Sequence, residues 1–543
     1  MSRQLECQRF IYKISSDRLR SAKWKLSISL EEARRNEEII SLASSQVLRW
    51  IDEMNGIEDA DERAKDIKRR IRALKREPAS SETRREIKKL YADLDAVQFK
   101  PDYMCLVVDK VSDYRRACKG FSINGVRYRR LLGTPGGIKM STVVFVSERV
   151  YDELNRRINN DRDPEKKFVP AKLEAYKALA CSASLPVSMP RGILVVKDLE
   201  TTFPDLVIDL SNSDGGEPVL SEPTTKEVTI TPSDGCGMML PRLAARWSEE
   251  LHLDYIMNCC NTRNSFEKGC VFAFPFDEFA DQIAHTYVVK DAWGNDIDIR
   301  NVELILTTSM LKLWDSYSSI DDYLGKCEKN GYSFAITKTA PRELESMRRS
   351  NYQFIQSFNL TDDDIEELLA PTIKELHDVL SMDWRKSVLF LKGVGLNEKN
   401  VLKLEDDFIK GIMIEPSLIH DPYIRASIYR RIKNRINEAK IGVINLHANY
   451  SIICGDLYAL CQHIFGLPVT GILKANEVWN GYWANQQSDE LLAFRAPMSC
   501  HENIRRVRPA KRDDVRWWFR YMQTCTVLSA WSNEMAALNG CDL

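Results

Sequence analysis

Five charged side chains, far apart in the chain, are of the types that nucleotidyl transfer uses. That reaction needs cations that hold a polyphosphate and carboxylates that hold Mg²⁺. Arg263, Lys268 and Lys312 could supply the cations, and Asp542 could supply one carboxylate. Arg495 could contact the sugar or the phosphates of a nucleotide. Each residue alone is more often a solvated surface charge, but each lies beside a predicted strand end or a glycine turn. We therefore treat them as one candidate site.

The composition is typical of a soluble globular protein with several domains. The chain has 543 residues, enough for roughly three or four domains. Apolar residues make up 44% and charged residues 29% of the chain. The formal net charge is −1, so any contact with nucleic acid has to come from local basic patches.

The cysteine pattern and the N-terminal residues predict a protein of the reducing cytoplasm. The 14 cysteines include no Cys-x-x-Cys spacing, which argues against a zinc ribbon and against a disulfide framework. We find no apolar run long enough to span a bilayer and no apolar signal core at the N-terminus. The sequence also lacks a P-loop signature, a dinucleotide fingerprint and a His-Glu-x-x-His motif.

Residues 1–101 are predicted to be a helical N-terminal region that contains an antiparallel hairpin. Apolar residues recur there at helical spacing in three stripes. The stripes are Ile40, Ala43, Val47, Ile51 and Met54; Ala64, Ile67, Ile71 and Leu74; and Ile87, Leu90, Leu94 and Val97. The alternative is a basic arm that follows a nucleic-acid backbone. Opposite charges are interspersed on the outer faces, which favours the hairpin.

Residues 102–222 are predicted to be a mixed α/β region, with a domain boundary in the polar stretch from Ser211 to Pro223. The region contains a glycine-rich turn with a lysine, Gly133–Lys139. Such a turn could cradle a phosphate through its backbone N–H groups, but it is more often a hairpin turn.

Two β-rich stretches, residues 223–340 and 441–543, are predicted on either side of a helical connector at residues 341–440. Short strands separated by glycine turns, such as Ser233–Gly237, suggest a barrel rather than a parallel α/β sheet.

Two charged segments of the connector have alternative interpretations. Thr361 and the acids at 362–364 predict a helix start rather than a metal site, because consecutive residues on a helix point in different directions. Residues 422–440 predict a strongly basic helix, which is the best candidate in the chain for contact with a nucleic-acid backbone. A solvated helix face is the alternative.

In an ordered series of such stretches, the chain resembles the single-chain RNA polymerases of bacteriophages. These are related to the cellular RNA-dependent RNA polymerases of RNA silencing, and both groups have two double-psi β-barrels that face one active site. The resemblance extends from about residue 130 to the end. It is carried by Arg130–Lys139, Ser141–Val146, Val169–Ser182, Ser233–Gly237, Arg263 with Lys268 and Gly269, Lys312, Ser350–Gln356, Gly455 with Asp456, Arg495–Pro497 and Asn539–Asp542.

The resemblance implies an α+β fold in four parts. These are a helical N-terminal hairpin, a double-psi β-barrel, a helical connector and an incomplete second double-psi β-barrel. It also implies a nucleotidyltransferase that adds ribonucleotides to an RNA 3′ end on a nucleic-acid template. Arg263, Lys268 and Lys312 would hold the triphosphate and the RNA end, and Arg495 would contact the incoming nucleotide.

The template and the class of function stay open. The phage-like stretches favour DNA, and RNA is the close alternative because the silencing polymerases share the barrels. A non-catalytic nucleic-acid-binding relative is the second alternative. The expected partners are template, RNA product and ribonucleoside triphosphates, without a membrane, in the host cytoplasm if the protein is encoded by a phage.

The sequence departs from the family at the catalytic motif Asp-x-Asp-Gly-Asp. In the family, three aspartates of this motif bind Mg²⁺. The chain has Asp542 at the first position and Leu543 at the variable position, and then it ends. We expect this chain alone to be inactive, either as a piece of a longer protein or as a product that a second polypeptide completes.

Overall fold

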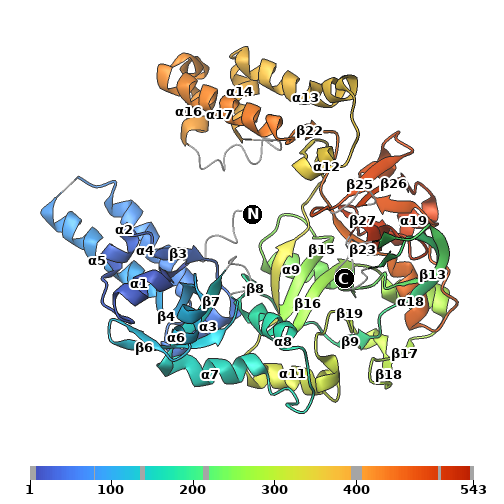
Figure 1. Ribbon diagram of the computed structural model, residues 1–543, viewed down its shortest axis with the longest axis horizontal. Coiled ribbons are helices and arrows are strands. Elements are labelled where there is room, and N and C mark those ends of the chain that lie inside the picture. Colours follow the sequence, from blue (N-terminus) through green and yellow to red (C-terminus); the bar gives the residue numbers. More distant parts are fainter. Residues whose placement is uncertain are drawn as a thin grey trace. The chain divides into compact units, whose positions relative to one another are not determined.

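The computed structural model describes residues 8–78, 80–134, 141–211, 219–392, 407–498 and 503–538. Helices and strands are mixed throughout these ranges, which confirms the predicted α+β class (Figure 1). None of the helices in these ranges is both long and apolar enough to cross a membrane.

The chain forms two compact units, and it passes between them several times. Unit 1 consists of residues 1–198, 233–339 and 461–468, and unit 2 consists of residues 199–232, 340–460 and 469–543. The two units group segments that are far apart in the sequence, whereas the five regions expected from the sequence are consecutive. The division into two units does not test those five regions, so they stay a prediction.

Unit 1 begins with a seven-stranded mixed sheet in the order β2-β5-β6-β7-β4-β1-β3. Its strands are β1 (Arg9–Ser15), β2 (Lys25–Leu26), β3 (Ile39–Leu42), β4 (Phe99–Val107), β5 (Phe121–Ile123), β6 (Val126–Leu132) and β7 (Thr142–Ser147). All six residues of β7 are buried, since helices cover the sheet and β4 and β6 flank this strand.

The first predicted helical stripe is wrong at its beginning. Ile40 belongs to strand β3, which pairs antiparallel with β1, and the helix α3 (Gln46–Met54) starts only afterwards. The Ser45 hydroxyl caps this helix by accepting from the Leu48 backbone N–H. The β-branched pair at residues 39 and 40 favours a strand, and spacing alone does not detect this.

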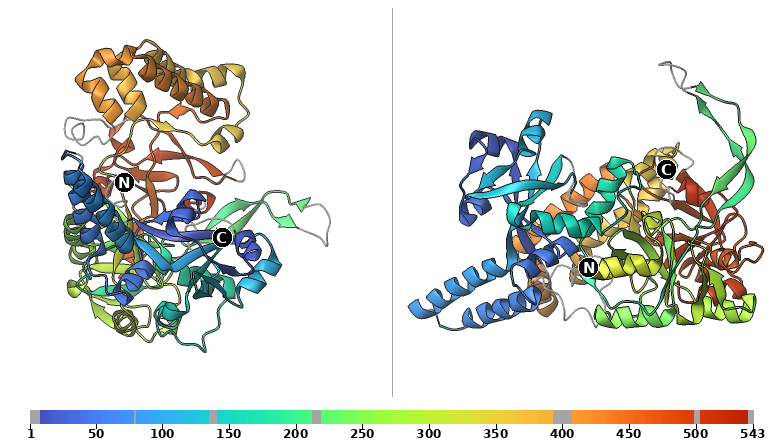
Figure 2. Two further views of the ribbon diagram at one scale, coloured as in Figure 1. Left: turned by 90° about the vertical axis from the view of Figure 1, so that its left-hand side faces the viewer. Right: turned by 90° about the horizontal axis from the view of Figure 1, so that it is seen from below.

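The helical hairpin is formed by α4 (Ala60–Leu74) and α5 (Ser81–Gln98), which run side by side (Figure 2). The second and third stripes supply its core, since Ala64, Ile67 and Ile71 pack against the stripe of α5. The structure therefore confirms the predicted hairpin.

The second part of unit 1 is another seven-stranded mixed sheet, in the order β8-β20-β15-β16-β14-β19-β9. Its strands are β8 (Leu185–Pro186), β9 (Ile193–Val196), β14 (Cys236–Met239), β15 (Cys259–Asn264), β16 (Glu267–Ala273), β19 (Leu304–Thr307) and β20 (Ala335–Thr339). β14 runs parallel to β16 and antiparallel to β19. This half-barrel sheet agrees with the predicted first double-psi β-barrel, and it also includes two strands that lie before residue 223 in the sequence.

Unit 2 contains a long two-stranded ribbon, formed by β10 (Thr201–Val207) and β13 (Thr224–Ile230). At its base the Thr201 hydroxyl donates to the Ala530 carbonyl at 2.6 Å. The domain boundary predicted between Ser211 and Pro223 falls between the two strands of this ribbon. In the sequence alone, a polar stretch that connects two strands resembles a linker between domains.

The helical connector is confirmed. Its helices are α12 (Tyr352–Gln356), α13 (Asp362–Leu380), α14 (Trp384–Lys392), α16 (Asp407–Ile414) and α17 (Pro422–Lys440). Thr361 and Asp364 form a capping box at the start of α13, as the acidic helix start predicted. Residues 362–364 are exposed.

The last part of unit 2 is a five-stranded mixed sheet in the order β23-β27-β24-β26-β25. Its strands are β23 (Ile452–Gly455), β24 (Glu477–Asn480), β25 (Leu491–Phe494), β26 (Ile504–Pro509) and β27 (Cys525–Leu528). Residues 469–473, which precede β24, form no strand. Gly471 takes a positive φ of 70° there, and the N–H groups of Ile472 and Leu473 donate to Asp456.

Candidate nucleotide-binding site

The hairpin of β15 and β16 brings two of the predicted cations together. Arg263 and Lys268 are directly opposite each other in its antiparallel register. Side chains alternate between the faces of a strand, so Arg263 and Lys268 share one face. The other face carries Cys260 and Val271, which belong to the core of unit 1.

Lys312 reaches the same hairpin through its backbone. The Lys312 N–H donates to the Phe266 carbonyl at 3.1 Å, and the Lys268 N–H donates to the Met310 carbonyl at 3.0 Å. A bridge between Glu267 and Leu311 completes this pairing. We call Arg263, Lys268 and Lys312 the basic hairpin site.

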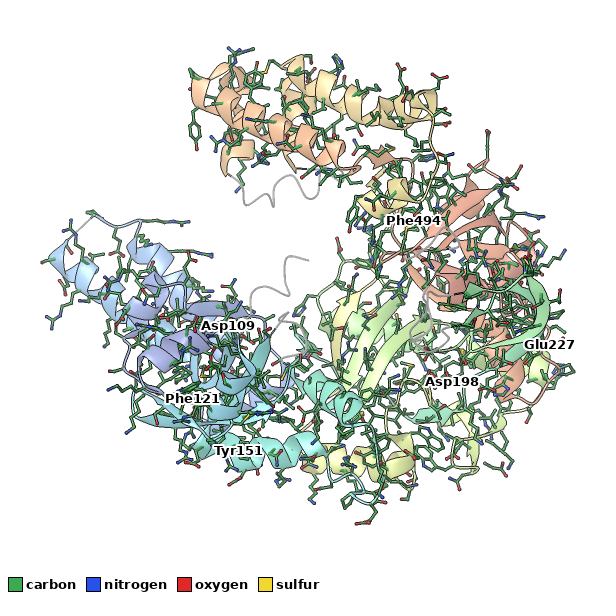
Figure 3. The ribbon with its side chains drawn as sticks, viewed as in Figure 1. Asp109, Phe121, Tyr151, Asp198, Glu227 and Phe494 are labelled. Atoms are coloured by element: carbon green, nitrogen blue, oxygen red, sulfur yellow. The ribbon has the colours of Figure 1, made fainter. Side chains whose placement is uncertain are left out.

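Asp198 fixes the turn that leads to Lys312, and the sequence did not single it out. Its Oδ1 accepts from the hydroxyls of Ser233 and Ser309 at 3.0 and 2.7 Å. Its Oδ2 accepts from the Thr308 hydroxyl and the Ser309 N–H, both at 2.7 Å. Asp198 follows strand β9 (Figure 3), so one carboxylate joins three segments that are distant in sequence. The only sequence signal was an acid just after a buried strand.

The glycine turn at residues 233–237 packs tightly against these segments. Gly235 has a positive φ of 66°, its N–H donates to the Ser309 hydroxyl, and its carbonyl accepts from the Cys270 N–H. A Cβ on Gly237 would lie 2.5 Å from the Ile305 carbonyl oxygen. The prediction that this turn needs glycine is therefore confirmed.

Burial shifts the pKa values of two side chains of the hairpin. Burial lowers the pKa of Arg263, while the nearby charge of Glu267 opposes this shift. Burial also raises the pKa of Glu267 to about 7, although a hydrogen bond from Thr262 and the charge of Arg263 lower it. The exposed side chain of Lys268 and the half-buried one of Lys312 are the more accessible cations of the site.

Arg495 lies in unit 2, directly after strand β25, and its side chain is exposed. Its Nη1 is 3.4 Å from the Leu538 carbonyl oxygen, beside helix α20 (Glu534–Ala537). The structure therefore assigns Arg495 to a different unit from the basic hairpin site.

Asp542 lies outside the described residues, as does the sequence Asn539–Asp542 that carries the resemblance to the catalytic motif. Within the described ranges, no three His, Cys, Asp or Glu side chains gather so that they could hold a metal ion.

The glycine-rich turn at residues 133–139, for which a phosphate cradle was one interpretation and a hairpin turn the more usual one, falls largely on residues 135–140, which lie outside the described residues. Just before them, the Gly133 N–H donates to Glu174 at 2.7 Å, and Arg130 donates to the same carboxylate at 3.0 Å. A carboxylate at this position repels a phosphate, so this end of the turn is a poor anion site.

The basic helix α17 has one buried arginine and several exposed cations. Arg435 is 2% exposed and bonds to Glu375 and to the Val443 carbonyl, so its role is structural. The exposed cations are Arg425, Arg430, Arg431, Lys433 and Lys440. Arg431 Nη1 donates to the Leu391 carbonyl at 3.1 Å, and the other four could contact a nucleic-acid backbone.

The comparisons with known proteins include a curated relative and a solved structure. No family model matches the chain. The chain is similar to the DNA-directed RNA polymerase YonO of Bacillus phage SPbeta, with 28% identity over 375 residues that cover 66% of this chain. The match covers 41% of YonO, so the chain spans about two fifths of that relative. A structural likeness links it to the RNA-dependent RNA polymerase QDE-1 from Thielavia terrestris, with a TM-score of 0.47, 15% identity, and coverage of 81% of this chain and 48% of that one.

Proposed function

We propose, from the similarity to a phage DNA-directed RNA polymerase, that this chain is part of an RNA polymerase. The match of 375 residues with YonO is the observation that carries the proposal. It agrees with the resemblance to single-chain phage polymerases that the sequence motifs indicated. The reaction would be the addition of ribonucleotides to an RNA 3′ end, with template nucleic acid, RNA and ribonucleoside triphosphates as partners.

DNA is the favoured template, because the name of the curated relative agrees with the phage-like sequence motifs. An RNA template is the alternative. A relative that binds nucleic acid without chemistry is the other alternative. We do not propose a second polypeptide, because neither the fold nor the comparisons support one.

In this proposal the basic hairpin site binds the triphosphate and the RNA end. Lys268 and Lys312 flank one short stretch of paired backbone, so their spacing is held by hydrogen bonds rather than by flexible loops. Arg495 would contact the incoming nucleotide. Mg²⁺, which Asp542 would help to bind, would neutralise charge on the phosphates. Localisation in the host cytoplasm belongs to the same proposal.

Substitution of the two lysines tests the site assignment. Lys268→Ala and Lys312→Ala should each lower kcat/KM for ribonucleotide incorporation about tenfold or more, because each removes a charge-assisted contact with phosphate. The assay is RNA extension on single-stranded DNA and RNA templates by the longest natural protein that contains this sequence.

Lys290→Ala is the matched control, since Lys290 is an exposed lysine of unit 1 that pairs with Asp296 on another hairpin. If both site variants extend RNA as fast as the unaltered protein, the site is assigned wrongly. A protein that binds nucleic acid but never extends RNA would support the binding-only alternative.

A further inference from the structure

Glu267 carries a buried carboxyl on the opposite face of β16 from Lys268. The residue is 0% exposed, and its Oε1 accepts from the Thr262 hydroxyl at 2.7 Å. Its Oε2 has no hydrogen-bond partner among the described residues. Ionisation of this carboxyl costs free energy, because one of its oxygens has lost its contact with water without gaining a hydrogen-bond donor.

The ionisable groups that face Glu267 come from two elements. Arg263 and Cys260 lie on β15, and Tyr323 and Cys327 lie on helix α11 (Ile320–Lys329). Burial raises the pKa of Tyr323 and of both thiols, to about 12 for Cys327, so these groups are neutral near pH 7. Arg263 is thus the only cation in this set.

The side chains of Arg263 and Glu267 both form a hydrogen bond with Thr262 of β15. The Arg263 Nη1 donates to the Thr262 carbonyl at 2.6 Å, and the Thr262 hydroxyl donates to Glu267 at 2.7 Å. The Arg263 Nε is also buried without a hydrogen-bond partner among the described residues. The guanidinium therefore has unused capacity, and a bound anion and the Glu267 carboxylate would both attract it.

We propose that Glu267 is a positioning residue for Arg263, whose carboxylate competes with a bound triphosphate for the guanidinium, so that triphosphate binding is coupled to proton uptake at Glu267. The inference rests on the proposed function of the basic hairpin site. It adds to that function a group that touches no substrate and acts through Arg263.

The coupling acts near neutral pH. Since burial raises the pKa of Glu267 to about 7, both protonation states are populated there. A triphosphate that pairs with the Arg263 guanidinium weakens the attraction between Arg263 and the Glu267 carboxylate. The pKa of Glu267 then rises further. If this rise is about one pH unit, linkage makes ATP binding about fivefold weaker at pH 8 than at pH 6.

The test is calorimetry of ATP binding to the 543-residue chain at pH 6 and pH 8, in two buffers of different ionisation enthalpy. Glu267→Gln keeps the shape and an acceptor for Thr262. It should bind ATP about fivefold more tightly than the unaltered chain at pH 8, and equally at pH 6. The unaltered chain should take up about 0.4 more protons per ATP at pH 8 than Glu267→Gln. Comparison of the two proteins cancels the ionisation of ATP itself.

Glu328→Gln on α11 is the control, because Glu328 is exposed and should leave the pH dependence unchanged. Equal pH dependence in the unaltered chain and in Glu267→Gln, with binding still weakened by Lys268→Ala, would overturn the inference and leave the proposed function intact. ATP binding that neither Lys268→Ala nor Arg263→Gln weakens would overturn the proposed function instead. If Glu267→Gln does not fold, absence of proton uptake by the unaltered chain at pH 8 overturns the inference.

Discussion

Glu267 links the stability of unit 1 to pH, because its carboxyl is more easily protonated in the fold than in the unfolded chain. Burial raises its pKa from an ordinary value of 4.5 to about 7. Between these values the folded protein binds more protons than the unfolded one, so this contribution to the free energy of unfolding falls as pH rises. The loss is complete above pH 7 and is on the order of 3 kcal/mol.

Glu267→Gln should remove this dependence. Between pH 5 and pH 8, the free energy of unfolding of the variant, taken relative to the unaltered chain, should increase by on the order of 2 kcal/mol. Any cost of the buried amide group is the same at both pH values and cancels in this comparison. Urea unfolding at the two pH values measures the effect, and a relative stability that does not change with pH would contradict it.

Other contacts that hold the site together also come from residue types that are common in the chain. Asp198 is one acid among many, and it matters because three hydroxyls and a backbone N–H converge on it. The cations Arg263 and Lys268 were visible in the sequence through their spacing before a glycine. The roles of Glu267 and Asp198 were not visible, because a carboxylate shows its role only through what surrounds it.

At the scale of elements, Asp456 joins the start of helix α18 (Leu457–Ile464) to the loop at residues 471–473. Its Oδ1 accepts from the N–H groups of Tyr458 and Ala459, at 3.0 and 3.2 Å. Its Oδ2 accepts from those of Ile472 and Leu473, at 2.8 and 3.2 Å. The residue is 1% exposed, so these donors have no water to replace it.

Asp456→Ala should lower the free energy of unfolding by on the order of 3–5 kcal/mol, because four backbone N–H groups lose their acceptor. Asp456→Asn should cost about 2–3 kcal/mol, since the amide keeps one acceptor and turns N–H groups toward two donors. Asp489→Ala is the control, as Asp489 is exposed and forms a surface ion pair with Lys511. Denaturant unfolding measures all three, and an Asp456→Ala variant as stable as the control would contradict the prediction.

Strand β15 shows why element predictions fail in places. Its sequence, Cys259–Asn264, has no regular alternation of apolar and polar residues, so the local sequence alone does not indicate a strand. In the fold it pairs with β16 on one side and β20 on the other. Backbone pairing on both edges makes it a strand, and that pairing depends on partners far along the chain.

At the scale of the whole molecule, a net charge of −1 means that nucleic acid must be attracted by local patches. Helix α17 is such a patch, whereas the charges of the α4–α5 hairpin are largely balanced by nearby acids.

Joint substitution of Arg425, Arg430 and Lys433 by Ala should weaken binding of single-stranded nucleic acid. It should also reduce the slope of log K against log salt by about 0.7 per lost phosphate contact. The control replaces Arg85, Lys88 and Lys89, three exposed cations of α5. Fluorescence anisotropy at several salt concentrations measures both sets, and equal slopes for the two sets would argue against α17 as a backbone-contacting helix.

The sequence by itself determined the features that depend on near neighbours. Helical periodicity predicted the α4–α5 hairpin, the clustered cations predicted the basic helix α17, Thr361 with the acids after it predicted a helix start, and residues 233–237 predicted a glycine turn. The tertiary structure alone decided that Arg263, Lys268 and Lys312 meet on one hairpin, that Asp198 fixes the turn beside it, and that Glu267 lies buried behind it. The physical reason is that caps and periodic faces are set within a few residues. Strand partners and the environment of a buried charge arise from segments that are far apart in the sequence.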